Sequence, residues 1–373
     1  MNIKVDADKL RIAFLGLREF FDYFYISGFQ SFFRRITSEM LFNGMRVDYI
    51  LYDSGKSEEI EPEPNLRLRY FQDFEDAILA MSSSNYDHII TIRLSRRDRF
   101  KVAFFRKKYL GPAKCHYMSL VWPDSWIKRN LIFIEAKLVS GNGKIISISP
   151  RLYQSLNRWA KNVEFIFPPV TKSYFLKPEE KPKNDKIKIT FLGVIYPDKG
   201  IDEVIHIFTA LKEDQKFELS IYAIYEPRNK ESLELRNWLK NQNIIKYVEV
   251  DRYNYTPEVE DIVRKVLKET DIFIQLYRTL GATVDVPLLL LEAMASLCAV
   301  ITTPIGNIAD IYGESKFLID TKYSISQIVS FLKNISFEEI KRERERIFEQ
   351  NKKFEFEASK VAQQFIRILT DNQ

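Results

Sequence analysis

Residues 285–304, DVPLLLLEAMASLCAVITTP, decide the fold that the rest of the chain must accommodate. Asp285 can cap the start of a helix, and Pro287 suits a first helical turn, where its missing N–H group leaves no hydrogen bond unmade. A helix is therefore predicted to begin here, and residues 299–303 predict a buried strand directly after it. Both elements are expected to lie in the interior of a domain, and Glu292 is the one charged side chain on the helix.

Glu292 needs compensation on so apolar a helix, because moving an unpaired carboxylate out of water is costly. In one interpretation it forms a structural ion pair with a buried arginine or lysine. In the other it lies near the mouth of a cleft and accepts hydrogen bonds from the hydroxyl groups of a ligand. The stretch itself supports the two interpretations equally.

The composition fits a soluble globular protein, with 373 residues, 46% of them hydrophobic and 29% charged. This length is enough for two domains with separate cores. No apolar run reaches the roughly 18 to 20 residues of a membrane span. The first residues, MNIKVDADKLRIAFLG, lack the apolar core and cleavage site of a signal peptide. The protein is therefore expected to be cytoplasmic and unprocessed.

Cysteine and histidine are scarce and dispersed. Cys115 and Cys298 stand in apolar surroundings, and His88, His116 and His206 lie far apart in the sequence. Neither a disulfide framework nor a metal site is expected from such spacing.

A strand–helix–strand pattern occurs twice along the chain. LRIAFLG at 10–16, a helical pattern ending at Gly44 and the strand RVDYILYD form the first unit, and IKITFLG at 187–193 restarts the pattern. Between them, residues 171–186 hold two prolines and eight charged residues without an apolar period, which is typical of a linker. Alternation of this kind predicts parallel sheets covered by helices on both faces.

The predicted fold class is α/β, with two doubly wound Rossmann-like domains. The N-terminal domain is expected at 1–170, the linker at 171–186 and the C-terminal domain at 187–353. Residues 354–373 are expected to form a helix that crosses back to the N-terminal domain, because an apolar stripe needs a surface to cover it. This stripe consists of Ala358, Val361, Ala362, Phe365, Ile366 and Leu369.

Residues 91–108, TIRLSRRDRFKVAFFRKK, carry eight basic side chains and one acid, Asp98. A solvated helix face is one interpretation of this segment. Docking to anionic lipid headgroups is a second, because aromatic residues alternate with the cations as they do in interfacial helices. No nucleic-acid-binding motif accompanies the charge, and the net charge of the chain is only +5, so no nucleic-acid partner is expected.

The two similar open-sheet domains, the short linker and the PLLLLEAMA helix together resemble the nucleotide-sugar-dependent glycosyltransferases of the GT-B architecture, specifically the retaining family 4 type. The stretch FLGVIYPDKGIDEVIHIF at 191–208 looks like the first strand, loop and helix of that family's donor domain, and Lys199 matches its donor-diphosphate lysine. Glu292 in LLEAMA resembles the glutamate that holds the donor's ribose. The resemblance implies two domains that face a cleft.

The resemblance also implies how the donor is held. GT-B enzymes neutralise the charge of the leaving nucleoside diphosphate without a metal, so the expected donor is a UDP- or GDP-linked sugar, with no separate cofactor. A helix start at 287–290 and a lysine suit that charge. Lys199 and Glu292 are expected to be catalytic. The expected donor-binding residues are Gly28, Lys199, Arg252, Tyr253, Arg278, Asp285, Pro287, Leu288 and Glu292.

Several positions depart from the family pattern. Val194 stands where the family usually has an arginine, and Val284 stands where it usually has a second glutamate. Gly28 is followed by phenylalanine, whereas the family commonly has two adjacent glycines. The sequence WPDSW occupies the neighbourhood of the family's N-terminal-domain histidine, so Asp124 is the nearest polar candidate on the acceptor side.

The predicted function is the transfer of a sugar from a nucleotide-diphosphate sugar to a glycan or lipid-linked acceptor, with retention of configuration. The segment 91–108 adds an anionic membrane surface as an expected partner, and hence a peripheral position on the cytoplasmic face of a membrane. The alternative is a non-catalytic binding or scaffold protein of the same fold, for which Val194 and Val284 are the evidence. An epimerase or phosphorylase of the same architecture is a third hypothesis.

Overall fold

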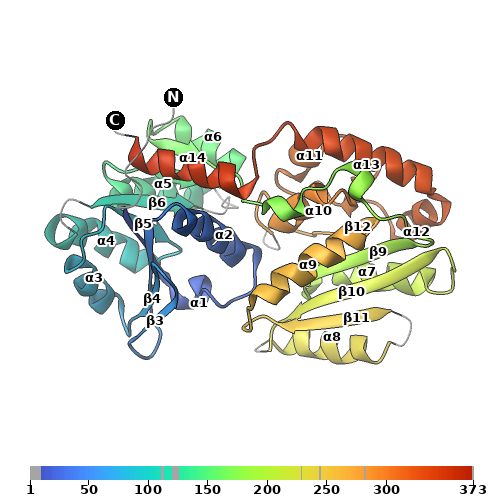
Figure 1. Cartoon of the computed structure of the whole chain (residues 1–373), viewed down its shortest axis with the longest axis horizontal. Coiled ribbons are helices and arrows are strands. Elements are labelled where there is room, and N and C mark those ends of the chain that lie inside the picture. The colour runs from blue at the N-terminus through green and yellow to red at the C-terminus, as the bar shows by residue number, and fades with distance from the viewer. Residues whose placement is uncertain are drawn as a thin grey trace. The chain divides into compact units, whose positions relative to one another are not determined.

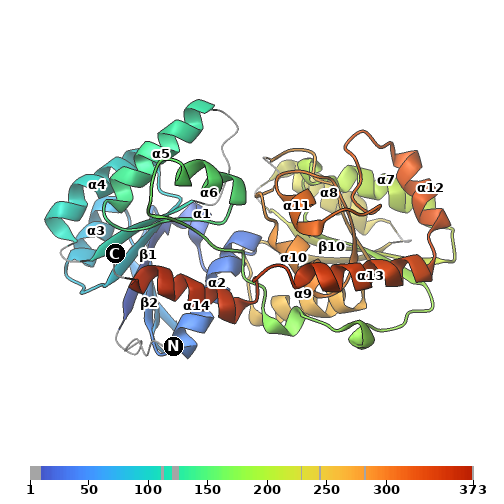
Figure 2. The ribbon, with the colours of Figure 1, turned by 90° about the horizontal axis from the view of Figure 1, so that it is seen from above.

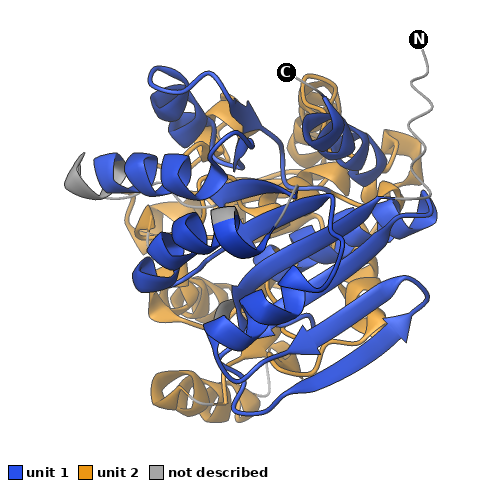
Figure 3. Ribbon diagram, turned by 90° about the vertical axis from the view of Figure 1, so that its left-hand side faces the viewer, with its two compact units in different colours: residues 1–23, 29–169, 358–373 blue, residues 24–28, 170–357 orange. Residues whose placement is uncertain are grey.

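The chain forms two compact units (Figure 3). Unit 1 comprises residues 1–23, 29–169 and 358–373, and unit 2 comprises residues 24–28 and 170–357. The computed structural model describes residues 10–110, 113–119, 126–227, 229–242, 245–280 and 283–371, without the side chains of residues 20, 107 and 126–129.

The described part of unit 1 is built on an 8-stranded sheet in the order β3-β4-β2-β1-β5-β6-β7-β8 (Figure 1). Neighbouring strands are parallel except for β3, which runs antiparallel to β4 at the sheet edge. The central strands are buried apolar runs, as expected where helices cover both faces. The strands are β1 (Arg11–Leu17), β2 (Arg46–Tyr52), β3 (Glu58–Glu63), β4 (Leu66–Tyr70), β5 (His88–Ile92), β6 (Lys114–Ser119), β7 (Ile145–Ser147) and β8 (Val163–Phe165).

Helices lie on both sides of this sheet, with α4 and α5 on one side and α2 and α14 on the other (Figure 2). Their starts follow local capping rules. Asp73 Oδ1 accepts the Asp76 N–H at 2.9 Å and caps α3, and Ser149 caps α6. The helices are α1 (Arg18–Phe21), α2 (Gly28–Phe42), α3 (Phe74–Ser82), α4 (Arg96–Tyr109), α5 (Trp126–Ser140), α6 (Pro150–Asn157) and α14 (Ala358–Thr370).

The C-terminal helix α14 belongs to unit 1, as predicted. The centroids of the Phe365 and Phe14 rings lie 6.4 Å apart, and Gln364 Nε2 donates to the Phe165 carbonyl at 2.9 Å. Most of the predicted apolar stripe is buried, but Ile368 takes the buried place expected for Ile366. The helix therefore covers the apolar surface beside β1.

Unit 2 contains a 5-stranded sheet in its described part, in the order β11-β10-β9-β12-β13, and every pairing in it is parallel. The two open α/β sheets confirm the predicted fold class. The strands are β9 (Ile187–Val194), β10 (Phe217–Tyr225), β11 (Lys246–Asp251), β12 (Ile272–Gln275) and β13 (Ala299–Thr302).

The helices of unit 2 alternate with these strands and continue beyond the last one. Helix α13 starts with a capping box, since Ser336 Oγ accepts the Glu339 N–H and Glu339 accepts the Ser336 N–H. The α-helices are α7 (Ile201–Leu211), α8 (Lys230–Lys240), α9 (Pro257–Glu269), α10 (Leu288–Ala295), α11 (Ile308–Tyr312), α12 (Ile325–Asn334) and α13 (Phe337–Asn351). The short 3-10 helices are η2 (Lys172–Tyr174), η3 (Pro178–Glu180) and η4 (Pro197–Lys199).

The predicted cap of α10 is wrong. Pro287 itself occupies the cap position, and the helix has no side-chain cap bond. Asp285 instead uses its carbonyl to accept the Asn307 N–H at 3.0 Å. The backbone of Asp285 thus pairs with the turn after β13.

Among the described residues, no helix combines the length and the apolar character that crossing a bilayer demands. The same residues contain no group of three or more His, Cys, Asp or Glu side chains arranged to hold a metal ion.

Candidate functional site

The candidate site lies at the carboxyl edge of the unit 2 sheet. Strands β12 and β13 end side by side, with Gln275 paired to Thr302. Helix α10 begins at Leu288 after the loop that follows β12. Ligands of open parallel sheets bind at this edge, beyond the ends of the strands.

Lys199 is held at this edge by the short η4 turn. The next residue, Gly200, has φ +74°, and a Cβ on it would lie 2.0 Å from the Leu276 carbonyl oxygen. Only glycine allows so close an approach, so the turn packs directly against the end of β12. The Lys199 Nζ then lies 5.6 Å from the centroid of the Tyr277 ring.

Arg252 provides a second cation, in the loop after β11. Its Nη1 lies 3.0 Å from Glu226 Oε2 and 3.5 Å from the Tyr196 hydroxyl, and its carbonyl accepts the Ile26 N–H at 2.8 Å. Burial, followed by the positive charge of Arg252, lowers the pKa of Lys199 to about 8. The charge of Arg252 thus disfavours the charged form of Lys199, and a bound anion would relieve this repulsion.

The start of α10 adds backbone donors. Leu290 and Leu291 donate the first hydrogen bonds of the helix, both to the Pro287 carbonyl. The N–H groups of Leu288 and Leu289 come before these bonds and have no acceptor within the helix. Such groups and the helix dipole favour a negative charge. Glu292 lies one turn further and is buried.

Residues 24–28 also belong to this part of unit 2. The Tyr255 N–H donates to the Phe24 carbonyl at 3.0 Å, and the Tyr25 and Tyr253 rings meet edge to face at 4.7 Å. A Cβ on Gly28 would lie 3.4 Å from the Cβ of Leu288. Gly28, Tyr253 and Leu288, all expected from the sequence, therefore bound one region.

Three neutral polar side chains near this edge have a buried oxygen without a hydrogen-bond partner among the described residues. These are Gln275 Oε1, Thr302 Oγ1 and Asn307 Oδ1. A buried acceptor left unpaired costs about 1–3 kcal/mol, so these three oxygens are available to a donor from a ligand. The sequence interpretation did not include them, because a lone Gln or Thr in a buried strand gives no motif.

Arg278 and Asp285 lie elsewhere on the same edge. Arg278 Nε donates to Glu203 Oε1 at 2.7 Å, and Arg278 Nη2 lies 3.7 Å from Asp202 Oδ2, so its charge is engaged by the acidic start of α7. Asp285 is buried beside Gly306, whose Cβ position would lie 3.0 Å from the Asp285 Cα.

Of the positions that depart from the family pattern, Val194 ends β9, and Val284 is partly buried in the loop before α10. Neither can replace the charge of the expected arginine or glutamate. Asp124, the acceptor-side candidate, lies outside the described residues.

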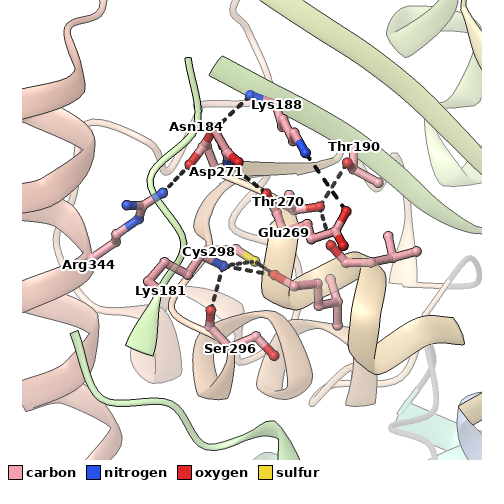
Figure 4. Close-up of polar contacts among 12 residues, drawn as sticks. Lys181, Asn184, Lys188, Thr190, Glu269, Thr270, Asp271, Ser296, Cys298 and Arg344 are labelled. Carbon is pink, nitrogen blue, oxygen red and sulfur yellow. Dashed lines mark hydrogen bonds and ion pairs between the residues drawn. The ribbon is translucent and has the colours of Figure 1, made fainter. Parts of the chain in front are cut away.

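The opposite end of α10 is anchored by a lysine that the sequence assigned to a linker (Figure 4). Lys181 is buried, and its Nζ donates to the Ser296 carbonyl at 2.7 Å and to the Leu267 carbonyl at 2.8 Å. The Leu176 N–H donates to the Ala295 carbonyl at 3.0 Å. Burial lowers the pKa of Lys181. The segment 171–186 therefore ties down the carboxyl end of the helix whose amino end lies at the site.

A second set of contacts in Figure 4 joins the same segment to the sheet. Asp271 Oδ2 accepts the Lys188 N–H at 2.9 Å and the Asn184 Nδ2 at 3.0 Å, and Asp271 Oδ1 pairs with Arg344. Asp271 precedes β12, so these bonds fix that strand against α13.

Cations and a helix start at the carboxyl edge of a parallel sheet are typical of nucleotide-binding α/β proteins. Residues 186–334 match the model of the family described as Glycosyl transferases group 1. The similarity to this family covers that segment, which is less than half of the chain. The match confirms the predicted family and the predicted enzyme class, a glycosyltransferase that uses a nucleotide sugar. No curated protein sequence matches the chain.

Solved structures match nearly the whole chain. Sucrose-phosphate synthase from Thermosynechococcus elongatus has a TM-score of 0.66 and 13% identity, over 96% of this chain and 98% of that one. WaaG, a glycosyltransferase involved in lipopolysaccharide biosynthesis, has a TM-score of 0.62 and 13% identity, over 97% and 100%. Anabaena HepE in complex with UDP-glucose has a TM-score of 0.63 and 12% identity, over 97% and 99%. Identities this low establish the fold alone, which is the predicted GT-B fold.

Proposed function

We propose that this protein transfers a glycosyl group from a nucleoside-diphosphate sugar to an acceptor hydroxyl, with retention of configuration at the anomeric carbon. The observation that carries the proposal is the pair Lys199 and Arg252 at the sheet edge where α10 begins. Each is tied to this edge through the backbone of its own loop, so the cations are in place before the ligand arrives.

Lys199 acts on the leaving group in this proposal. As the bond between the anomeric carbon and the donor phosphate oxygen breaks, negative charge grows on the diphosphate. The ammonium of Lys199 and the N–H groups at the start of α10 stabilise that charge. The acceptor oxygen forms its bond to the anomeric carbon on the same face, and its proton passes to the departing phosphate oxygen.

Glu292 anchors the donor's ribose through its carboxylate, one turn further along α10 than the diphosphate. Arg252, Tyr253 and Gly28 bound the donor from the loop after β11 and from residues 24–28. Asp285, Pro287 and Leu288 shape the entrance to α10. Arg278 does not bind phosphate in this proposal, because it already pairs with Asp202 and Glu203 at the start of α7. It neutralises these two carboxylates near the donor site.

The donor is UDP- or GDP-linked in this proposal, and HepE in complex with UDP-glucose supports testing UDP first. The acceptor is a glycan or a lipid-linked sugar, bound by the N-terminal domain at 1–170, while 187–353 binds the donor. WaaG, which is involved in lipopolysaccharide biosynthesis, supports a lipid-linked acceptor. The expected place of action is the cytoplasmic face of a membrane.

A thermal-shift series with UDP, GDP, ADP and CMP tests the proposal, because a ligand that binds only the folded state raises the melting temperature. We expect one of UDP and GDP to raise it and CMP to leave it unchanged. Release of that diphosphate from its labelled sugar nucleotides then measures turnover. If neither UDP nor GDP binds, the proposed function is wrong.

A second candidate is a family member that binds the donor without turning it over. Val194 and Val284 favour it, because both remove a charged group from the family's donor motif. Binding of a nucleoside diphosphate without release of product from any tested sugar nucleotide would support this candidate over the first.

A further inference from the structure

Helix α4 of unit 1 exposes cations and aromatic rings on one face. Arg97, Phe100, Phe104 and Lys108 are all exposed and recur at helical spacing. Phe104 exposes 70% of its surface and Phe100 exposes 48%. Exposed apolar side chains that gather on one face mark an interaction surface, whereas single ones do not.

The neighbouring helix α5 continues this face. Ile134 and Leu138, one turn apart, expose 50% and 41% of their surfaces, and Lys137 between them is exposed. Trp159, just after α6, exposes 72%, and its ring lies 6.4 Å from that of Phe133 on α5. Tryptophan is enriched at the boundary between water and lipid.

The two helices are joined, and they lie side by side in Figures 1 and 2. Arg99 pairs with Glu135, Arg96 Nε lies 3.4 Å from the same carboxylate, and Arg106 Nη1 donates to the Val139 carbonyl at 3.1 Å. These contacts hold α4 and α5 together, so their exposed residues form one continuous surface.

The acids of these helices are turned inward. Asp98 and Glu135 are both buried, Asp98 against Tyr52, whose hydroxyl donates to it at 2.9 Å. Every exposed charged side chain described on α4 and α5 is therefore a cation. Residues 91–108 contain eight basic residues. Arg99 and Arg106 bond to Glu135 and to the Val139 carbonyl within unit 1, so fewer than eight cations are available on the exposed face.

We infer that the outer face of α4 and α5 is a docking surface for an anionic lipid membrane. The cations bind headgroup phosphates while the phenylalanine, isoleucine and leucine side chains enter the interface, a combination typical of interfacial helices. The inference names a partner for the proposed transferase, but it stands on unit 1 alone and holds whether or not transfer is observed.

Sedimentation of the full chain with vesicles tests the inference. We expect binding to phosphatidylcholine vesicles that contain phosphatidylglycerol, little binding to phosphatidylcholine alone, and weaker binding at high salt. The double substitution Arg97→Glu and Lys108→Glu should lower the partition coefficient by about tenfold or more. Phe100→Ser with Phe104→Ser should also lower it, at every salt concentration.

Phe42→Ser is the matched control, because Phe42 is 88% exposed at the end of α2, on the other side of the same sheet. It should leave vesicle binding unchanged, and all variants should keep the wild-type melting temperature within a few degrees. Equal binding to neutral vesicles, no binding at all, or no loss in the α4 variants would overturn the inference. Salt-sensitive binding to RNA in the absence of vesicle binding would overturn it in favour of a nucleic-acid surface.

Discussion

Lys181 Nζ lies 2.7 Å from the carbonyl oxygen of Ser296, the residue that ends α10. The same ammonium reaches the Leu267 carbonyl near the end of α9, so one buried cation satisfies the negative ends of two helices. The amino end of α10 is the candidate anion site. One end of this short helix is therefore fixed by a lysine, and the other end is where we propose that the donor diphosphate binds.

Lys181→Met is expected to lower the free energy of unfolding by about 1–3 kcal/mol, because two buried carbonyls lose their donor. Chemical denaturation measures the change. Lys183→Met is the control, since Lys183 is exposed two residues away and its substitution should have no effect. A Lys181→Met protein as stable as the wild type would show that the anchor contributes nothing.

Lys199→Ala should reduce turnover by about a hundredfold or more, the effect of removing one preorganised charge stabiliser. The melting temperature should not fall, because burial disfavours the charged form of this lysine. Initial rates of diphosphate release measure the loss, with Lys212→Ala, a lysine just after α7, as the control. Unchanged turnover in Lys199→Ala would remove its proposed role.

The pH dependence of kcat/KM should reveal the lowered pKa of Lys199. The charged form is the one that stabilises the leaving group, so kcat/KM is expected to fall as the pH rises through about 8. In Arg252→Met the like charge is gone, and the fall should move to higher pH. In Lys199→Arg it should vanish from the accessible range, because arginine stays protonated. A profile that is flat to pH 10 in the wild type would contradict this assignment.

Much of the architecture could be predicted because the spacing of apolar residues along the chain indicates its strands and helices. Buried runs such as LRIAFLG and IKITFLG, each followed by a helical pattern, gave both sheets, and the stripe around Phe365 gave α14. The β3–β4 hairpin was missed. Strand β3, EEIEPE, is almost wholly exposed and charged, so it has no apolar period, and only its pairing with β4 makes it a strand.

Residues of the candidate site could be predicted only where they belong to a recognisable sequence motif. Lys199 and Glu292 followed from their family motifs, whereas the roles of Lys181 and Arg278 depend on partners more than seventy residues away in the chain. Prolines and charges around Lys181 predicted a linker, and the buried carbonyls that accept hydrogen bonds from this lysine have no sequence signature. Gln275 stands out only in three dimensions, where its side-chain oxygen has no hydrogen-bond partner among the described residues.

His88 and His116 give the chain a stability that depends on pH. His88 begins β5 and His116 lies within the neighbouring strand β6. His88 Nδ1 is 3.1 Å from His116 Nε2, and the Lys144 N–H donates to His116 Nδ1 at 3.0 Å. His116 therefore carries its proton on Nε2 and donates it to His88, so both rings are neutral. Burial lowers the pKa of His88 to about 4 and that of His116 to about 3, against an ordinary value of 6.5.

The unfolded chain consequently binds more protons than the folded one below pH 6.5, and the free energy of unfolding falls as the pH drops from there toward 4. Between pH 6.5 and 5 the loss should be on the order of 1–2 kcal/mol per histidine. Denaturation of the wild type and of His88→Asn with His116→Asn at both pH values measures it. The variant should be less stable than the wild type at pH 7 but should lose less stability on acidification, whereas an equal loss in both proteins would assign the effect to other groups.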